Sequence, residues 1–328
     1  MCWWCHRRER ELKHSSGECM FDIQRILATT DFSADSVNAE SRGALLCQDM
    51  RLDALELLTV QRTRLGAILA HALRNDNSDP EAMLVAQALQ KLRNAEQRIR
   101  SAFDVRCRYA VRIGDPVAEV LAASQSKAAD MIVMAKPTGS FLGNLKETAA
   151  DRLMRMSKLP VLLVRNDPLG SYREVLVPVD FSNESRHAAR LALRIAPKAN
   201  IIFLHAYRVW AEGKMREAGV YDKIIHAYRM KYREQARQEL NQFIKDLGPV
   251  SQEITRVVQF GWAVPVITSY AKRVSPDLIV LGKHSGSRVE EFLIGSVTRR
   301  TIDQTTSDVL ITPGHDPDHD VWYERPAA

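Results

Sequence analysis

The sequence lacks the long apolar run that a membrane span requires. Such a span needs about 20 consecutive apolar residues, whereas this chain of 328 residues is 45% hydrophobic and 26% charged, with the two kinds mixed throughout. It also lacks long Lys/Arg blocks and interleaved aromatic series, although its formal net charge is +6. These absences predict a soluble protein with neither a membrane nor a nucleic acid as its partner.

Cysteine is scarce and irregularly placed. The chain has five cysteines, Cys2, Cys5, Cys19, Cys47 and Cys107. Their odd number and wide scatter are unlike the dense, even framework of a secreted disulfide protein. The first residues also lack the apolar stretch of a secretory signal. We therefore expect a cytoplasmic protein.

The first 19 residues are rich in charge and have no apolar periodicity. They contain C-x-x-C-H, the pattern of covalent haem attachment, but they supply no apolar pocket for a haem. Their three cysteines and a histidine could bind zinc, although the ligand spacing is irregular. We expect instead that residues 1–19 form a disordered extension. The His/Asp-rich tail at 315–328 could bind a divalent metal, but such tails are usually solvated.

The rest of the chain repeats itself. "ILATTDFSADS" returns as "VLVPVDFSNES", which places Asp31 opposite Asp180, and a second pair of segments places Gly114 opposite Gly261. "LPVLLV" then parallels "SDVLIT", and "RNDPLGSY" between the copies has the residue types of a linker. We expect a first domain at 20–166 and a second at 172–314.

Each copy alternates apolar runs of strand length with segments of helical period. This alternation is typical of βαβ units and predicts an α/β fold of two tandem five-stranded parallel-sheet domains. In the second copy we expect strands at 175–179, 201–205, 255–260, 278–281 and 309–312. A long helix between 214 and 247 should cover the sheet.

Both copies end in a short β-branched strand, at 161–164 and 309–312. We expect these two strands to lie close together, so that the copies form a pseudo-dimer about a pseudo-two-fold axis within one chain. A further homodimer of the whole chain stays open.

These features together resemble the universal stress protein family, here in tandem form. The resemblance rests on two copies of strand, "DFS" and helix, on the loop "GKHSGSRVEEFLIGSV", and on the closing strand, and it covers nearly all of residues 20–314. It implies a Rossmann-like fold related to the adenine nucleotide alpha hydrolases. ATP-binding members carry G-x-x-G, nine residues, then G-[ST], which matches Gly282, Ser285, Gly295 and Ser296 with one glycine replaced.

Such a loop has a physical reason to hold a phosphate. Phosphate oxygens need several N–H donors, which small residues and a helix N-terminus provide together. Ser285 replaces the second glycine, and Gly286 beside it could take the same backbone role. The candidate nucleotide-binding residues are Pro178, Asp180, Gly282, Ser285, Gly286, Gly295, Ser296 and Val297. Lys283, His284, Arg299 and Arg300 lie near enough in sequence to assist.

Two of these candidates follow the first strand of the second copy. The resemblance implies that Pro178 and Asp180 lie against the adenosine, at the carboxyl edge of the sheet where ligands collect. The alternative for Asp180 is a turn carboxylate at the start of a helix, because "FSNES" follows it and Ser182 can cap that helix. Both roles can coexist.

The first copy departs from the motif. Ala135 stands in place of Gly282, and an alignment backwards from the final strands puts Glu147 and Thr148 opposite Gly295 and Ser296. A carboxylate at that helix start would occupy the donors and repel a phosphate. We expect this copy to be a degenerate scaffold without a ligand.

No motif for catalysis is present in the repeated copies. G-x-S-x-G, the Walker A lysine motif and H-x-G-H are all absent, so at most weak ATP hydrolysis is expected. The sequence predicts a cytoplasmic stress-response protein that binds ATP or a related adenine nucleotide in its second domain, with or without Mg²⁺. It would act as a regulatory or protective module with an unidentified protein partner. The alternative is a nucleotide-independent interaction scaffold.

The N-terminal extension yields a direct prediction. Deleting residues 1–19 should leave the melting temperature and the nucleotide affinity almost unchanged, because a charged segment without apolar periodicity buries little surface. Differential scanning calorimetry and nucleotide titration of the two proteins check this. A melting temperature several degrees lower, or stoichiometric zinc lost with the segment, would overturn it.

Overall fold

The computed structural model describes residues 23–62, 80–136, 148–283 and 295–313. The extension 1–19, the tail 315–328, and the candidate residues Ser285 and Gly286 lie outside the described residues. The expectations attached to them therefore stay predictions.

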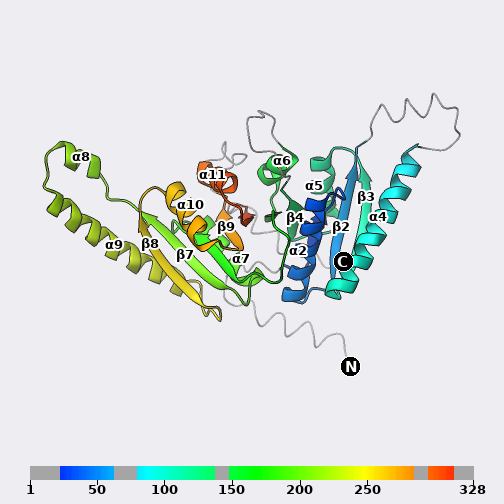
Figure 1. Ribbon diagram of the computed structural model, residues 1–328, viewed down its shortest axis with the longest axis horizontal. Coiled ribbons are helices and arrows are strands. Elements are labelled where there is room, and N and C mark those ends of the chain that lie inside the picture. The colour runs from blue at the N-terminus through cyan, green and yellow to red at the C-terminus, as the bar shows by residue number, and fades with distance from the viewer. Residues whose placement is uncertain (1–22, 63–79, 137–147, 284–294, 314–328) are drawn as a thin grey trace. The chain divides into compact units, whose positions relative to one another are not determined.

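The first copy alternates strands and helices along its described length (Figure 1). Its elements are β1 (Ile26–Thr29), α2 (Ala34–Met50), β2 (Ala54–Gln61), α4 (Pro80–Phe103), β3 (Arg106–Ile113), α5 (Pro116–Ser126), β4 (Met131–Ala135), α6 (Ala149–Met156) and β5 (Val161–Val164).

The second copy has the same alternation. Its elements are β6 (Glu174–Pro178), α7 (Asn183–Ile195), β7 (Asn200–Tyr207), α8 (Glu212–Glu217), α9 (Asp222–Lys245), β8 (Ile254–Phe260), α10 (Ala263–Val274), β9 (Leu278–Gly282), α11 (Ser296–Gln304) and β10 (Asp308–Thr312). The five strands expected in this copy are confirmed, each within a few residues at its ends.

The single helix expected between 214 and 247 is wrong in one respect, because the segment forms two helices. Helix α8 ends where the N–H of Gly219 bonds to the carbonyl of Arg216 and the N–H of Val220 bonds to that of Met215. Gly219 has a φ of +72°, a conformation that closes a helix and that glycine adopts without a steric penalty. Helix α9 then begins afresh at Asp222, and its second half packs against β7 and β8.

The ten described strands form one sheet in the order β3-β2-β1-β4-β5-β10-β9-β6-β7-β8. All pairs within a copy are parallel, while β5 and β10 pair antiparallel through Val161 with Ile311, Leu162 with Leu310, and Leu163 with Val309. Each copy thus has the strand order 3-2-1-4-5, and the α/β fold and the proximity of the two closing strands are confirmed. The Leu162–Leu310 pair marks the local pseudo-two-fold axis.

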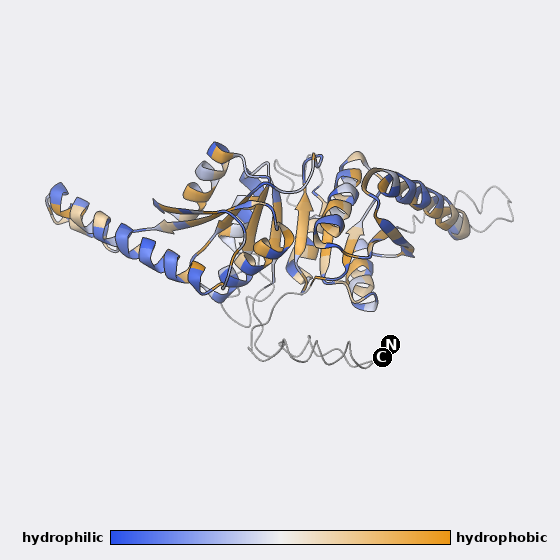
Figure 2. Cartoon of the chain, turned by 90° about the horizontal axis from the view of Figure 1, so that it is seen from below, coloured by the Kyte–Doolittle hydropathy of each residue, from blue (hydrophilic) through white to orange (hydrophobic). Residues whose placement is uncertain are grey.

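Helices cover both faces of the sheet, so the central strands are buried, whereas the edge strands β3 and β8 are partly exposed. Hydrophobic residues gather on the strands and on the helix faces toward them, whereas the long helix α9 is largely hydrophilic (Figure 2). In α7 the expected apolar face is confirmed, since Ala188, Leu191, Ala192 and Ile195 are fully buried. Ser182 caps this helix by accepting a hydrogen bond from the N–H of Ser185 at 3.1 Å.

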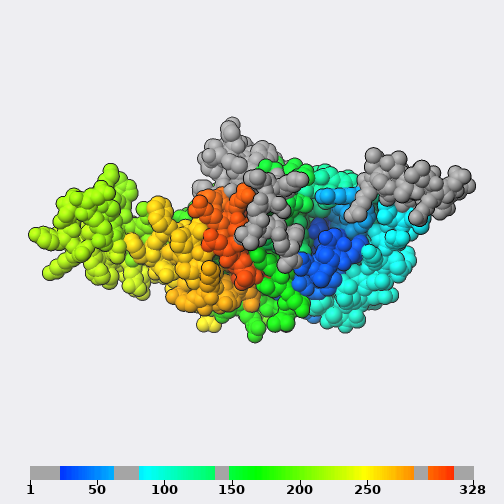
Figure 3. Space-filling model, turned by 45° about the horizontal axis from the view of Figure 1, so that its top comes forward, coloured from blue at the N-terminus to red at the C-terminus, as the bar shows by residue number. Residues whose placement is uncertain are grey.

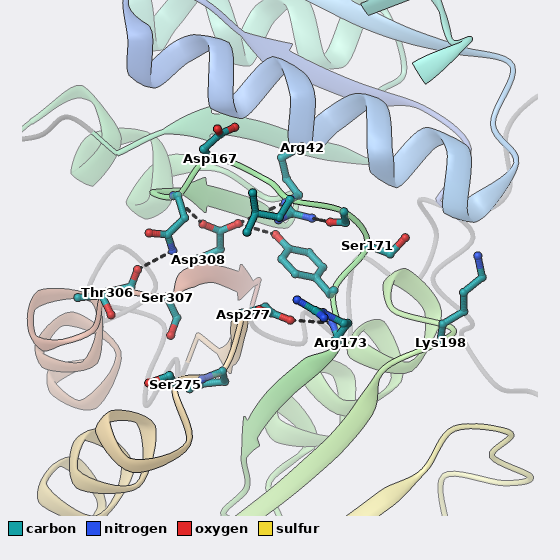
Figure 4. Close-up of a pocket in the computed structure, with 15 residues that line it drawn as sticks. Arg42, Asp167, Ser171, Arg173, Lys198, Ser275, Asp277, Thr306, Ser307 and Asp308 are labelled. Carbon is teal, nitrogen blue, oxygen red and sulfur yellow. Dashed lines mark hydrogen bonds and ion pairs between the residues drawn. The ribbon is translucent and has the colours of Figure 1, made fainter. Parts of the chain in front are cut away.

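A buried carboxylate joins the two copies where β10 begins (Figure 4). Asp308 is 1% exposed; its oxygens accept hydrogen bonds from the backbone N–H of Arg165 at 2.8 Å and the hydroxyl of Tyr172 at 2.9 Å. The guanidinium of Arg42, from α2, lies 3.4 Å from the same carboxylate and over the Tyr172 ring. Burial raises the pKa of Asp308, and these donors only partly offset that rise.

Asp308→Ala should destabilise the protein strongly. It would leave the N–H groups of Arg165 and Asn166 and the hydroxyl of Tyr172 without their acceptor. It would also leave Arg42 without its buried counter-charge, which typically costs about 3–5 kcal/mol. Tyr172→Phe removes one hydrogen bond and should cost about 1 kcal/mol. Urea unfolding at neutral pH measures both values. Equal costs for the two variants would show that the carboxylate is not the centre of this network.

Candidate functional site

The central strands of the second copy separate toward their carboxyl ends. Strands β6 and β9 pair through Val175 with Leu278 and Leu176 with Ile279, but Pro178 pairs only with β7 and Gly282 only with β10. Pro178 has no N–H to offer to a neighbouring strand. The carboxyl ends of these strands therefore form the topological switch point at which open α/β sheets bind ligands.

Asp180 lies in the turn that follows β6. Its Oδ1 accepts hydrogen bonds from the backbone N–H of Ser182 at 3.1 Å and from the Ser182 hydroxyl at 2.5 Å. The turn role expected as the alternative is therefore present. Asp180 is also exposed, so a second role toward a ligand is compatible with this geometry.

The turn beyond Asp180 is held by aromatic packing. Phe181 adopts a φ of +66°, which is rare for a bulky side chain. Its ring stacks on His205 with centroids 4.3 Å apart, and Nδ1 of His205 lies 2.8 Å from the carbonyl oxygen of Val179. His205 is thus a structural residue of this turn.

Gly282, the last residue of β9, lies directly against helix α7. A Cβ atom at this position would stand 2.7 Å from the backbone carbon and oxygen of Glu184. A glycine is therefore needed for packing here, and the contact brings the first turn of α7 beside the end of β9. The first copy has Ala135 at the corresponding strand end.

Helix α11 begins at the same edge, and within the described residues no side chain caps its N-terminus. Its N-cap residue is Gly295, which supplies no side-chain hydrogen bond, and its first turn has no acidic residue. Ser296 and Val297 follow and are exposed. The first N–H groups of a helix have no intrahelical partner, and the helix dipole places positive potential on them. This helix end is chemically suited to an anion.

The corresponding helix of the first copy closes its own N-terminus. In α6 the Thr148 hydroxyl accepts from the N–H of Asp151 at 3.1 Å, and the Asp151 carboxylate accepts from the N–H of Thr148 at 3.0 Å. This capping box satisfies donors and adds a negative charge where an anion would bind.

The capping box also corrects the register that the sequence suggested. The N-cap residues place Thr148 opposite Gly295, one residue away from the expected match, because α11 is nine residues long and α6 eight. Glu147 lies outside the described residues. The carboxylate that blocks this helix end is that of Asp151, and the spacing T-x-x-D could have revealed it.

Lys283 does not have the position expected for it. Its side chain is 6% exposed, and its ammonium donates a hydrogen bond at 2.7 Å to the carbonyl oxygen of Arg155, in the first copy. Sequence proximity to the loop suggested a phosphate ligand. The tertiary structure directs the lysine to the contact between the copies instead.

Sequence reasoning also missed the cluster around Asp308. Asp308, Arg165, Tyr172 and Arg42 lie far apart in the chain and carry no motif. The one available signal was the acidic residue before the closing β-branched run, where the first copy has Pro160. The cavity of about 580 Å³ beside this cluster lies at the start of β10, at the amino edge of the second copy's strands and away from its switch point (Figure 4).

The described residues contain neither a metal-binding cluster nor a reactive thiol nor a membrane-spanning helix. Within the described ranges, no three His, Cys, Asp or Glu side chains are grouped to hold a metal ion. Cys47 and Cys107 are buried, and burial raises the pKa of each thiol to about 12, so neither is a thiolate at neutral pH. None of the described helices has the length and apolar character needed to cross a membrane.

Comparison with known proteins gives the context of this site. The universal stress protein family model matches residues 22–165 and again 171–313. A universal stress protein of Methanocaldococcus jannaschii is 23% identical over 155 residues, covering 43% of this chain and 94% of that protein.

Two solved structures share the tandem fold. A universal stress protein of Archaeoglobus fulgidus has a TM-score of 0.62 at 18% identity, over 90% of this chain and 100% of that one. A functionally unknown protein of Pseudomonas aeruginosa has a TM-score of 0.57 at 18% identity, over 90% and 94%. The two family matches span most of the sequence, and the chain therefore belongs to the universal stress protein family, whose domain it carries twice.

Proposed function

We propose that this protein acts in the stress response by binding ATP or a related adenine nucleotide in its second copy. The observation that carries the proposal is the difference between two equivalent helix ends. Helix α11 begins at Gly295 without a side-chain cap or an acidic first turn, whereas α6 is closed by Thr148 and Asp151. One copy therefore offers donors to an anion and the other does not.

Each candidate residue has a place in this proposal. Ser296 and Val297 would donate backbone N–H groups to the phosphates, and the Ser296 hydroxyl would add a further donor. Pro178 and Asp180 would lie against the adenosine at the switch point, and Gly282 would keep α7 close. Ser285 and Gly286 would complete the loop. Mg²⁺ could accompany the phosphates.

The proposed role is regulatory or protective rather than enzymatic. Hydrolysis needs a general base placed beside a water molecule, and at this edge His205 is packed against Phe181 and Asp180 is bonded to Ser182. Nucleotide binding would instead change how the protein binds a partner protein. We place this activity in the cytoplasm, where the buried thiols of Cys47 and Cys107 stay reduced.

Gly295→Glu should abolish most of the ATP affinity. The new carboxylate would stand at the N-cap of α11, where it would accept hydrogen bonds from the first N–H groups of the helix and repel the phosphates, with an expected loss of about 3 kcal/mol or more. Isothermal titration with ATP measures the loss. Mass spectrometry of the wild-type protein as purified should also find an adenine nucleotide.

The same substitution elsewhere provides a matched control. Gly213 lies in α8 with no heavy atom within 4 Å of a Cβ built on it, so Gly213→Glu adds the charge without a steric clash. It should bind ATP like the wild type. If Gly295→Glu keeps wild-type affinity and its circular dichroism spectrum, the helix end does not hold the phosphate.

A second candidate function, a protein-interaction scaffold, is favoured by one exposed surface. The segment from α8 into the first half of α9, lime green in Figure 3, extends beyond the strands. Trp210, just before α8, is 81% exposed, and Tyr221, at the N-cap of α9, is 80% exposed. From Asp222 to Glu234, Ile225 is the one buried residue of α9. Exposed aromatic residues of this kind mark interaction surfaces.

The two functions can be separated in cells. Tyr221→Glu combined with Tyr228→Glu should disrupt this surface but leave the ATP affinity unchanged, because both side chains are exposed and belong to α9 and its N-cap. Stress survival is then compared between this double variant and Gly295→Glu. A phenotype confined to the double variant would favour the scaffold, and one confined to Gly295→Glu would favour nucleotide binding.

A further inference from the structure

Two lysines at equivalent positions cross between the copies. Lys136 follows β4 and donates to the carbonyl oxygen of Ile302, in α11, at 3.3 Å. Lys283 follows β9 and donates to the carbonyl oxygen of Arg155, in α6, at 2.7 Å. Helices α6 and α11 lie on either side of the β5–β10 pair in Figure 1. Each copy therefore contacts the C-terminal end of the other copy's last helix.

The last turn of α11 has no basic residue of its own, and its positive charge comes from the other copy. The carbonyl oxygen of Ile302 accepts from both Lys136 and the guanidinium of Arg165, and both donors belong to the first copy. The last carbonyl groups of a helix lack intrahelical donors, and the dipole places negative potential on them. Two cations from the first copy thus stabilise this end of the helix.

The N-terminal ends of α6 and α11 differ in how they are capped. The N-terminus of α6 is closed by its own capping box, so the contact from Lys283 holds a helix that offers nothing to an anion. The N-terminus of α11 begins at Gly295, which supplies no side-chain cap, and the first turn that follows has no acidic residue. With nine residues, α11 is a short rigid rod. A side chain that fixes its C-terminal end also fixes the direction of its N-terminal donors.

We propose that Lys136 is a positioning residue by which the first copy controls nucleotide affinity in the second. This inference rests on the proposed function of α11. It gives the first copy a role of its own, because that copy supplies the two cations, Lys136 and Arg165, that hold α11 in place. By linkage, a nucleotide bound at α11 should in turn strengthen the contact between the copies.

The charge of Lys136 can change near physiological pH. Burial, together with the nearby positive charge of Arg165, lowers the pKa of Lys136 to about 8, while Asp303 of α11 and Asp151 of α6 act in the opposite direction. Lys136 is mostly protonated at neutral pH, and it loses its positive charge as the pH rises through about 8. Ordinary lysines titrate about two units higher. The hold on α11 should therefore weaken between about pH 7.5 and 9.

The test compares ATP titrations of the wild type, Lys136→Met and Lys136→Arg. At about pH 7.5, Lys136→Met should bind ATP roughly five- to tenfold more weakly, and Lys136→Arg should bind nearly as well as the wild type. Between about pH 7.5 and 9, the wild-type affinity should fall about fourfold as Lys136 loses its proton. Lys136→Met should show no such fall.

Lys198→Met serves as the matched control. Lys198 is 77% exposed near Asp49 and contacts neither α6 nor α11 in the described part of the chain. This variant loses one positive charge and should keep the wild-type affinity and pH dependence. The wild-type pH titration needs no substitution, so it tests the inference even if Lys136→Met fails to fold.

The outcomes distinguish this inference from the function on which it rests. If Gly295→Glu loses ATP binding while Lys136→Met keeps the wild-type affinity, the positioning role is wrong and the proposed function stands. A wild-type affinity that is flat across this pH range also overturns the positioning role. If the wild type binds no ATP at millimolar concentration, both proposals fall.

Discussion

The antiparallel pairing of β5 with β10 is the contact on which the rest of this structure depends. Three residue pairs join two parallel sheets into one, and the central pair, Leu162 with Leu310, is fully buried. The pairing satisfies the edge of each copy that would otherwise stay open. It also places the carboxyl ends of the first copy's strands at the edge where the second copy's strands begin.

The opposite strand directions of the two copies explain three features of the structure. The linker from Arg165 to Arg173 can be short because β5 ends at the edge where β6 starts. The side chains that follow β4 and β5 can reach the C-terminal end of α11 for the same reason. Asp308, at the start of β10, meets the linker backbone and Arg42 there. The charged contacts between the copies are therefore consequences of strand direction.

Burying these charges has a cost that the contacts must offset. Desolvation disfavours the ionised forms of Asp308 and Lys136 alike, which is why the pKa of the first is raised and that of the second lowered. Ion pairs of this kind add little net stability compared with apolar packing, but removing one partner is costly. Their effect is to define one arrangement of the two copies.

The difference between the copies is small in sequence and large in chemistry. The same helix start has Thr148 with Asp151 in one copy, and in the other it has Gly295 followed by a first turn without an acidic residue. The strand end beside it has Ala135 in one and Gly282 in the other, where the backbone of Glu184 leaves no room for a Cβ. A few residues thus decide whether the first N–H groups of this helix are bonded by a side chain of the same helix or are left without such a cap.

The sequence by itself determined the duplication, the α/β fold, the strands of the second copy and the cap at Ser182. These depend on local periodicity and on residue types that act within a few positions of themselves. The helix break at Gly219 and the capping box of α6 could also have been predicted from the sequence. The long amphipathic pattern obscured the break, and a one-residue error in the alignment obscured the capping box.

Only the tertiary structure decided where Lys283, Lys136 and Asp308 act. Their partners lie more than 100 residues away in the chain, and a lysine beside a glycine-rich loop has the same local sequence whether it contacts a phosphate or a carbonyl group of the other copy. Strand order and strand direction settle that choice, since they determine which chain segments share an edge of the sheet.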